Sequence, residues 1–172
     1  MPRHAWMGER TTDAEWQSWL ELHSAKFLLY ARQKARSEAD AQDLMQEAII
    51  EAARRIGGDN PPAPALVFAT MHRRAIDLAR QDDRRRAREL AAAPGADSWF
   101  DTEIEDRERA RTIQVAMQKL PEIYREVITL KVWGELTFLE IAETLNIPAN
   151  TAASRYRYGL QELRRLSREV FT

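Results

Sequence analysis

Apolar and polar residues follow one another along most of this chain with the period of an amphipathic helix. Apolar side chains recur three or four positions apart in seven segments, at about 13–36, 38–55, 65–88, 107–120, 121–133, 138–145 and 148–170. This spacing places them on one face of each helix. No stretch of useful length has the two-residue period of a strand, and there is no internal repeat. The pattern predicts an all-α fold.

Residues that favour helix ends stand at several of the expected boundaries. Asp13 is suited to the N-cap of the first helix, and Gly57-Gly58 to the end of the second. Thr137 precedes an apolar run, with Glu140 three residues later, which is the pattern of a capping box. Asn146 tolerates the left-handed conformation of a tight turn. The last two segments are therefore predicted to be two helices joined by a short turn.

The composition changes near the middle of the chain. Pro94-Gly95 breaks the helical pattern, and residues 97–108 hold six acids against one arginine, together with Trp99 and Phe100. We interpret this stretch as an acidic linker between two small helical domains. The predicted organisation is a flexible N-terminal tail at 1–12, a first domain at 13–88, a linker at 89–106 and a second domain at 107–172.

Charge and residue content exclude several classes of protein. The net charge is −1, so a nucleic-acid surface needs local segregation of charge. There are no cysteines, the three histidines are scattered, and no glycine-rich phosphate loop or GxSxG turn is present. We therefore expect no catalytic residues, no metal, no cofactor and no small-molecule substrate. Without a signal peptide or an apolar segment that could enter a membrane, the chain is expected to be cytoplasmic.

The last two segments have the pattern of a helix-turn-helix, in which the second helix presents small and polar side chains at its N-terminal end. Asn150, Ala153, Ser154, Arg157 and Tyr158 form that outward set, with Arg155 at its edge. Arginine and asparagine can form paired hydrogen bonds with base edges. From spacing alone, a helical hairpin with a solvated charged face remains the alternative.

Two further helices carry segregated charge. The segment from Arg73 to Arg88 holds seven arginines against three aspartates, preceded by His72, and such a patch suits phosphate contacts. Phe68 and Trp99 could stack on unpaired bases, although lone aromatic residues are more often core. On the polar side of 38–55, Asp43, Gln46, Glu47 and Ile50 share one stripe. This stripe fits either protein docking or an ordinary solvated face.

Four motifs in order resemble the extracytoplasmic-function sigma factors of bacteria, from about Trp16 to Leu166. The segment 40–48 is similar to the region 2 motif that grips the polymerase clamp helices. Arg74 to Leu78, followed by arginines, is similar to the helix that melts and reads the −10 element. The segments 120–122, 125–127, 140–143, 147–148 and 151–155 resemble region 4, which reads the −35 element.

The resemblance implies partners and roles for individual residues. The partners would be core RNA polymerase, through its largest-subunit clamp helices and its flap, promoter DNA and an anti-sigma factor. The implied core-polymerase residues are Asp43, Gln46, Glu47 and Ile50. Those facing −10 DNA are Arg73, Arg74, Asp77, Arg80 and Arg84. Those facing −35 DNA are Asn150, Thr151, Ala153, Ser154, Arg155, Arg157 and Tyr158.

The chain departs from the family pattern at four of these positions or near them. Arg73 stands where asparagine is usual, Leu66 where tryptophan is common, Ala153 where a basic residue is frequent, and Tyr158 where arginine is frequent. The promoter sequence therefore cannot be copied from relatives. Because the acidic segments oppose the basic helix, the free factor is expected to bind DNA poorly until polymerase covers the acids.

Two other classes remain as alternatives. A dimeric helix-turn-helix regulator, acting without replacing the sigma subunit, would need a ligand pocket or a dimer helix in the N-terminal half. A helical bundle that binds only proteins is favoured less than either DNA-binding class. Footprinting distinguishes the first alternative, because such a regulator protects a palindrome without polymerase.

Overall fold

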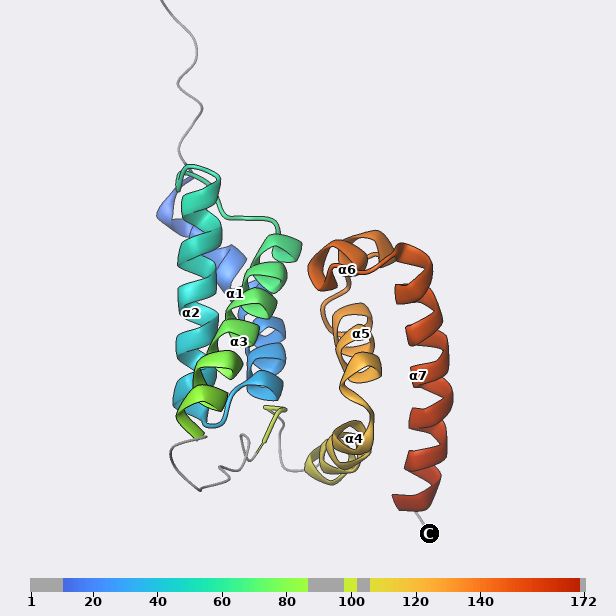
Figure 1. The fold of residues 1–172 in the computed structure, drawn as a ribbon. Helices are drawn as coiled ribbons and strands as arrows, with labels where there is room; N and C mark the ends of the chain where they lie inside the picture. Colours follow the sequence, from blue (N-terminus) through green and yellow to red (C-terminus); the bar gives the residue numbers. More distant parts are fainter. Residues whose placement is uncertain (1–10, 87–97, 102–105, 171–172) are drawn as a thin grey trace, which may run out of the picture.

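The fold is a set of α-helices, seen in a computed structural model that describes residues 11–86, 98–101 and 106–170; within these ranges there is no strand (Figure 1). The helices are α1 (Asp13–Lys34), α2 (Glu38–Arg55), α3 (Pro64–Arg86), α4 (Arg107–Lys119), α5 (Glu122–Val132), α6 (Phe138–Leu145) and α7 (Ala149–Val170). The all-α prediction is confirmed. The tail at 1–10 and most of the predicted acidic linker lie outside the described residues.

Helices α1, α2 and α3 pack together as an N-terminal unit, in which the apolar faces meet. Phe27 and Tyr30 of α1 contact Phe68 of α3, with ring centroids 5.0 and 5.7 Å apart. Ala41, Ala48 and Ala52 of α2 are fully buried, so α2 can lie close to its neighbours. Phe68 is therefore a core residue, as lone aromatics usually are, and not a stacking surface for bases.

Helices α4 to α7 form a C-terminal unit, in which α7 packs along α4, α5 and α6 (Figure 1). The capping box at the start of α6 is confirmed: the Thr137 hydroxyl accepts from the Glu140 amide, and the Glu140 carboxylate accepts from the Thr137 amide at 2.7 Å. Asn146 ends α6 in the left-handed conformation, with φ of 53°. The helix-turn-helix is therefore present as α6 and α7.

The two units pack directly against each other, which the sequence did not predict. Helix α3 lies along α6, and buried residues of both units, among them Val67, Met71, Val127 and Ile141, belong to one hydrophobic core (Figure 1). A second core brings Leu29 of α1 together with Trp99 and with residues of α4, α5 and α7. Each of these two hydrophobic cores therefore contains residues of both helical units.

One expectation about a single residue needs correction. The N-cap of α1 is Thr12, whose side chain accepts from the Glu15 amide in a capping box; Asp13 is the first helical residue. The apolar side chains of Ile76 and Leu78 on α3 are not core residues, since 39% and 49% of their surfaces are exposed. None of the described helices has the length and apolar character that crossing a bilayer requires.

Candidate protein and nucleic-acid interfaces

The docking stripe of Asp43, Gln46, Glu47 and Ile50 lies on the outer surface of α2. All four side chains are exposed, Ile50 to 50%. Leu44, Ala48 and Ile49 on the opposite face of the helix are buried, so the apolar periodicity of 38–55 orients the stripe outward. An exposed isoleucine among acids is a feature that a protein partner can cover.

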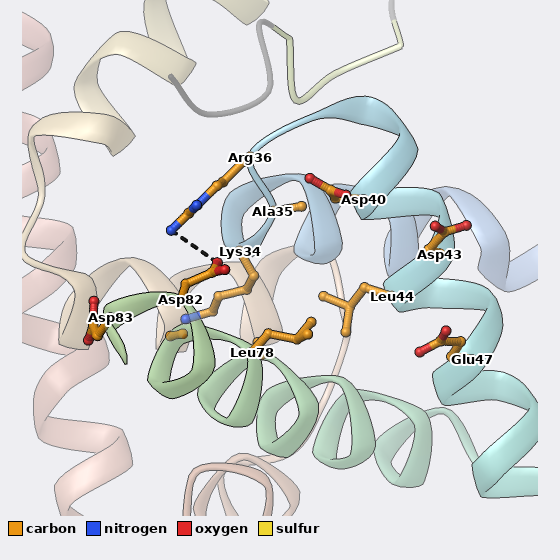
Figure 2. Close-up of a pocket in the computed structure, with 12 residues that line it drawn as sticks. Lys34, Ala35, Arg36, Asp40, Asp43, Leu44, Glu47, Leu78, Asp82 and Asp83 are labelled. Carbon is orange, nitrogen blue, oxygen red and sulfur yellow. Dashed lines mark ion pairs between the residues drawn. The ribbon is translucent and has the colours of Figure 1, made fainter. Parts of the chain in front are cut away.

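A groove of about 590 Å³ runs between the docking stripe and α3. Figure 2 shows Asp43 and Glu47 of α2 on one side and Leu78, Asp82 and Asp83 of α3 on the other, with Leu44 between them. Lys34 and Arg36 close one end, where Arg36 forms an ion pair with Asp82 at 3.0 Å. The groove therefore combines an apolar floor with a mainly acidic rim.

The first arginines of α3 are held by carboxylates of α2. Arg74 donates from Nη1 to Glu51 Oε2 at 2.9 Å and forms a second ion pair with Glu47, while Arg73 also pairs with Glu51. The hydrogen bond from Arg74 and the nearby arginine charges hold the pKa of Glu51 below its usual range. Arg73 and Arg74 are therefore neutralised by carboxylates of α2 and not by the aspartates of α3.

Glu51 is a candidate functional residue that sequence reasoning missed. It lies one helical turn beyond Glu47, a spacing that continues the acidic stripe along α2. That continuation was the available signal, but which arginine it meets depends on how α2 and α3 pack. The pairing also joins the predicted polymerase surface to the predicted −10 surface, because Glu47 belongs to the first and Arg74 to the second.

The remaining −10 candidates lie further along α3. Asp77, Arg80 and Arg84 are exposed, whereas the side chains of Arg85, Arg86 and Arg88 lie outside the described residues. His72 does not join this patch, since it turns toward the C-terminal unit, where its Nδ1 lies 3.4 Å from Glu126. Among the described residues, the exposed cations of the predicted patch are therefore Arg80 and Arg84, and His72 is not part of it.

The −35 candidates occupy the first three turns of α7. Asn150, Arg157 and Tyr158 are exposed. Thr151, Ala153, Ser154 and Arg155 are half-buried, while Ala152 and Tyr156 pack inward. The Arg157 guanidinium lies 4.9 Å from the Tyr158 ring centroid and donates to its hydroxyl at 3.2 Å. The outward set is therefore gathered on one face, with small residues flanked by an amide and a cation.

Trp99 is buried and supplies no surface for bases. Its amide donates to Gln114 Oε1 at 2.9 Å, and its carbonyl accepts from Arg32 Nη1 at 3.0 Å. Its ring lies under the guanidinium of Arg125, 5.8 Å away. In the part of the chain that the structure describes, no group of three His, Asp or Glu residues is placed to hold a metal ion.

Each of the two helical units matches a known protein family. The family profile for Sigma-70 region 2 matches residues 20–85, and that for Sigma-70 region 4 matches residues 110–163. The two matches follow the same order as the two helical units. Together they do not favour a dimeric helix-turn-helix regulator, because α1 to α3 match a sigma domain and not a ligand-binding or dimerisation domain.

Several curated relatives share part of the sequence. The ECF RNA polymerase sigma factor SigK of Mycobacterium bovis (strain BCG / Pasteur 1173P2) is 31% identical over 137 residues, which are 75% of this chain and 73% of the relative. SigW of Bacillus subtilis (strain 168), also an ECF sigma factor, is 44% identical over 63 residues, 37% of this chain and 34% of the relative. The chain therefore matches only about a third of SigW.

Two solved structures share the fold. The sigma factor RpoE of Bartonella quintana, solved in complex with the anti-sigma factor NepR, has a TM-score of 0.71 at 15% identity and covers 91% of this chain and 97% of its own. CnrH, solved with the cytosolic domain of CnrY, has a TM-score of 0.60 at 19% identity, covering 90% and 88%. With a region 2 unit, a region 4 unit and a relative of this similarity, the chain belongs to the extracytoplasmic-function group of the sigma-70 family of RNA polymerase sigma factors.

Proposed function

We propose that this chain binds core RNA polymerase and directs it to promoters, with the docking stripe on the polymerase clamp helices and the arginines of α3 on −10 DNA. The start of α7 reads −35 DNA, and the C-terminal unit also meets the polymerase flap. The observation that carries the proposal is the placement of exposed polar groups: Asp43, Gln46 and Glu47 lie on the outer face of α2, Arg80 and Arg84 on α3, and Asn150 and Arg157 at the start of α7. Binding to polymerase and to promoter DNA takes place in the cytoplasm and requires no catalytic residue.

The groove beside the docking stripe supports a protein partner there. Asp43 and Glu47 border it, and Leu44 and Leu78 supply apolar surface, so a helix with basic and apolar side chains is complementary (Figure 2). Interface energy is concentrated in a few central side chains surrounded by a polar rim. Ile50, exposed beside Glu47, is the apolar candidate for such a position.

The arrangement on α7 supports base reading. The half-buried Ala153 and Ser154 let the helix approach the floor of a major groove, and Asn150 and Arg157 offer hydrogen bonds to base edges. Because Ala153 carries no charge, fewer phosphate counter-ions are released on binding, and binding depends less on salt. Replacing Ala153 by arginine would steepen that dependence.

An anti-sigma factor is the second partner that we propose. The relatives RpoE and CnrH were solved with NepR, an anti-sigma factor, and with the cytosolic domain of CnrY. The groove and the docking stripe of this chain offer the surface that a competitor of polymerase needs. Co-purification of the tagged chain from its own cells, followed by competition with core polymerase, tests this part of the proposal.

The direct test is transcription in vitro with purified core polymerase on genomic fragments, including the promoter upstream of the chain's own gene. Replacing Asp43, Gln46 and Glu47 by alanine should weaken core binding at least about tenfold, because the charged contacts of the interface are lost. Replacing Glu21, Asp59 and Gln161 by alanine removes the same residue types from other exposed positions and should leave it unchanged. Equal binding by both variants would refute the proposal.

A further inference from the structure

Arg157 and Tyr158 contact each other on the exposed face of α7. The Arg157 guanidinium lies over the Tyr158 ring, 4.9 Å from its centroid, and Nη2 donates to the Tyr158 hydroxyl at 3.2 Å. Both side chains are exposed, Tyr158 to 48%. An exposed aromatic ring thus stands on a face that otherwise carries small and polar side chains. The two residues are called the Arg157–Tyr158 pair.

The packing of α7 on α5 fixes the direction in which the Arg157–Tyr158 pair faces (Figure 1). Gly159, the next residue, is buried, and a β-carbon there would lie only 3.0 Å from Tyr124 Cβ and from Ile128 Cδ1. Glycine therefore lets α7 lie close against α5 at this point. Because successive residues differ by about 100° around a helix, the two preceding side chains project away from α5 and into solvent.

Short side chains precede the pair on the same face of α7. Ala153 and Ser154 lie one turn toward the N-terminus, where they neighbour Arg157 and Tyr158 on the helix surface. Helical side chains lean toward the N-terminus of their helix. The two short residues therefore leave room beside the guanidinium, in the part of α7 that we assign to base reading.

Tyr158 restrains the Arg157 side chain without neutralising it. In the part of the chain that the structure describes, Arg157 forms no ion pair with a carboxylate, whereas Arg165 pairs with Glu162 and Glu169. A cation over an exposed aromatic ring is favoured by about twofold to fivefold. The hydrogen bond to the hydroxyl adds a direction to this contact, so the plane of the guanidinium is restrained together with its position.

A guanidinium with a restrained plane suits one base edge in particular. Guanine presents two acceptors in the major groove, O6 and N7, and arginine meets both with two parallel N–H groups. Tyr158 engages one N–H group of Arg157 and leaves the others for the base. An arginine loses much rotamer freedom on binding, so one that is already held in the required orientation discriminates better between bases.

We propose that Tyr158 is a positioning residue of the −35 surface: its ring and hydroxyl hold the Arg157 guanidinium in the plane in which it reads guanine. This inference rests on the proposed function, because it assumes that the start of α7 enters the major groove of the −35 element. Tyr158 acts through Arg157 and not through a contact of its own with the bases. Its neutral side chain also avoids the repulsion that a second cation would place beside Arg157.

The test measures the base preferences of holoenzyme formed from the full chain and core polymerase. The promoter fragments carry each base in turn at every −35 position. Guanine should be preferred at the position that Arg157 reads, and Arg157→Ala should abolish this preference. Tyr158→Ala should lower it by about threefold to tenfold and leave the preferences at other positions within about twofold, because only one contact loses its restraint. Tyr158→Phe retains the ring and should fall between the two.

Leu22→Ala is the control for loss of an exposed side chain. Leu22 lies on α1 and is 64% exposed, so its removal should leave every base preference unchanged. Circular dichroism should show the same helicity for all variants, because the altered side chains are exposed.

Tyr158→Arg separates positioning from general affinity for DNA. The added cation should tighten binding to every fragment and steepen the salt dependence by about one unit of slope. It also repels Arg157, so the preference for guanine should fall while affinity rises. A residue that only contacts phosphate would change affinity without changing the preference.

A double-mutant cycle distinguishes positioning of Arg157 from direct contact of Tyr158 with DNA. In the Arg157→Ala background, Tyr158→Ala should have no further effect on preference or affinity. An equal loss of affinity in both backgrounds would overturn the inference, as would a guanine preference that survives Tyr158→Ala or Arg157→Ala. Failure of the unaltered chain to direct initiation would refute the proposed function and the inference with it, whereas unchanged preferences in an active holoenzyme would refute the inference alone.

Discussion

Glu51 contacts Arg73 and Arg74, two residues that we assign to −10 DNA. A carboxylate there competes with DNA phosphates for the same guanidinium groups. Glu51→Gln should therefore strengthen binding of the free chain to a generic duplex by about twofold to fivefold and steepen its salt dependence. Fluorescence anisotropy at several salt concentrations measures both quantities, with Glu143→Gln as the control. Unchanged affinity would show that the arginines do not reach DNA.

Glu126 gives the molecule an acid sensitivity of predictable sign. Its pKa in the folded chain is below the ordinary value of 4.5, because His72 and Lys34 outweigh the effect of burial. Its stabilising contribution is therefore present above pH 4.5 and is lost as the pH falls through the lower pKa of the folded state. Tyr30 on α1 also interacts with this carboxylate, and Glu122 on α5 shares the ion-pair partner Lys34 with it.

Thermal unfolding between pH 7 and pH 3 checks this sign. The Tm of the unaltered chain should hold until about pH 5 and then fall. In Glu126→Gln the fall should be smaller, because the substituted side chain has no proton to gain. Other carboxylates with lowered pKa, such as Glu38 and Glu51, titrate in both proteins, so the difference between the two curves isolates Glu126. Parallel curves would contradict the assignment.

At the scale of single helices, residues close together in the sequence were sufficient to predict where most helices begin and end. Helix α2 begins and ends where its apolar period and Gly57-Gly58 predict, and the capping box of α6 follows from Thr137 and Glu140. These features depend on residues within one or two turns of each other. Thr12 was missed as a cap because Asp13, also a good N-cap residue, stands beside it. The elements were therefore predictable, with errors of one or two residues at their ends.

Asn146 sets the turn of the helix-turn-helix. It adopts the left-handed conformation, and its amide reaches the Ala142 and Glu143 carbonyls. Asn146→Ala should lower the free energy of unfolding by about 1 kcal/mol, since a β-carbon is unfavourable at this φ, whereas Asn146→Gly should retain most of the stability. Urea unfolding followed by circular dichroism measures both. Equal loss in the two variants would mean that the side chain matters more than the backbone conformation.

At the scale of the whole molecule, Trp99 joins the two units. It is only 5% exposed, lies in one core with Leu29 of α1 and Met117 of α4, and hydrogen-bonds to both units through its backbone. Trp99→Ala should cost about 3 kcal/mol or more of stability through the cavity that it leaves. It should also loosen the contact between the units.

Urea unfolding and small-angle scattering check this prediction together. Trp99→Phe keeps most of the buried volume and should lie between the unaltered chain and the alanine variant in both measurements. Loss of stability without any change in molecular dimensions would mean that the Trp99 side chain does not hold the two units together.

The contact between the units is what sequence could not predict. The period of α5 shows that Val127 and Leu130 share a face, and Glu126 beside them is a local exception to it. Its partners Lys34 and His72 lie 92 and 54 residues away, and no local rule connects them. The pairing of Glu51 with Arg73 and Arg74 likewise joins residues that are distant in the sequence, so no local rule predicts it. That the candidate residues of each surface share one face of a helix was predictable, whereas the partners that neutralise them depend on tertiary packing.

The shared position of Lys34 has a thermodynamic consequence. Lys34 lines the groove and forms ion pairs with Glu122 and Glu126 of α5. If a ligand of the groove binds more tightly when these ion pairs are broken, linkage requires that the same ligand weaken the ion pairs by the same factor. A substitution of Glu126 and saturation with the ligand thus measure one coupling free energy from opposite sides. A ligand that occupies the groove without contacting Lys34 leaves the ion pairs unchanged.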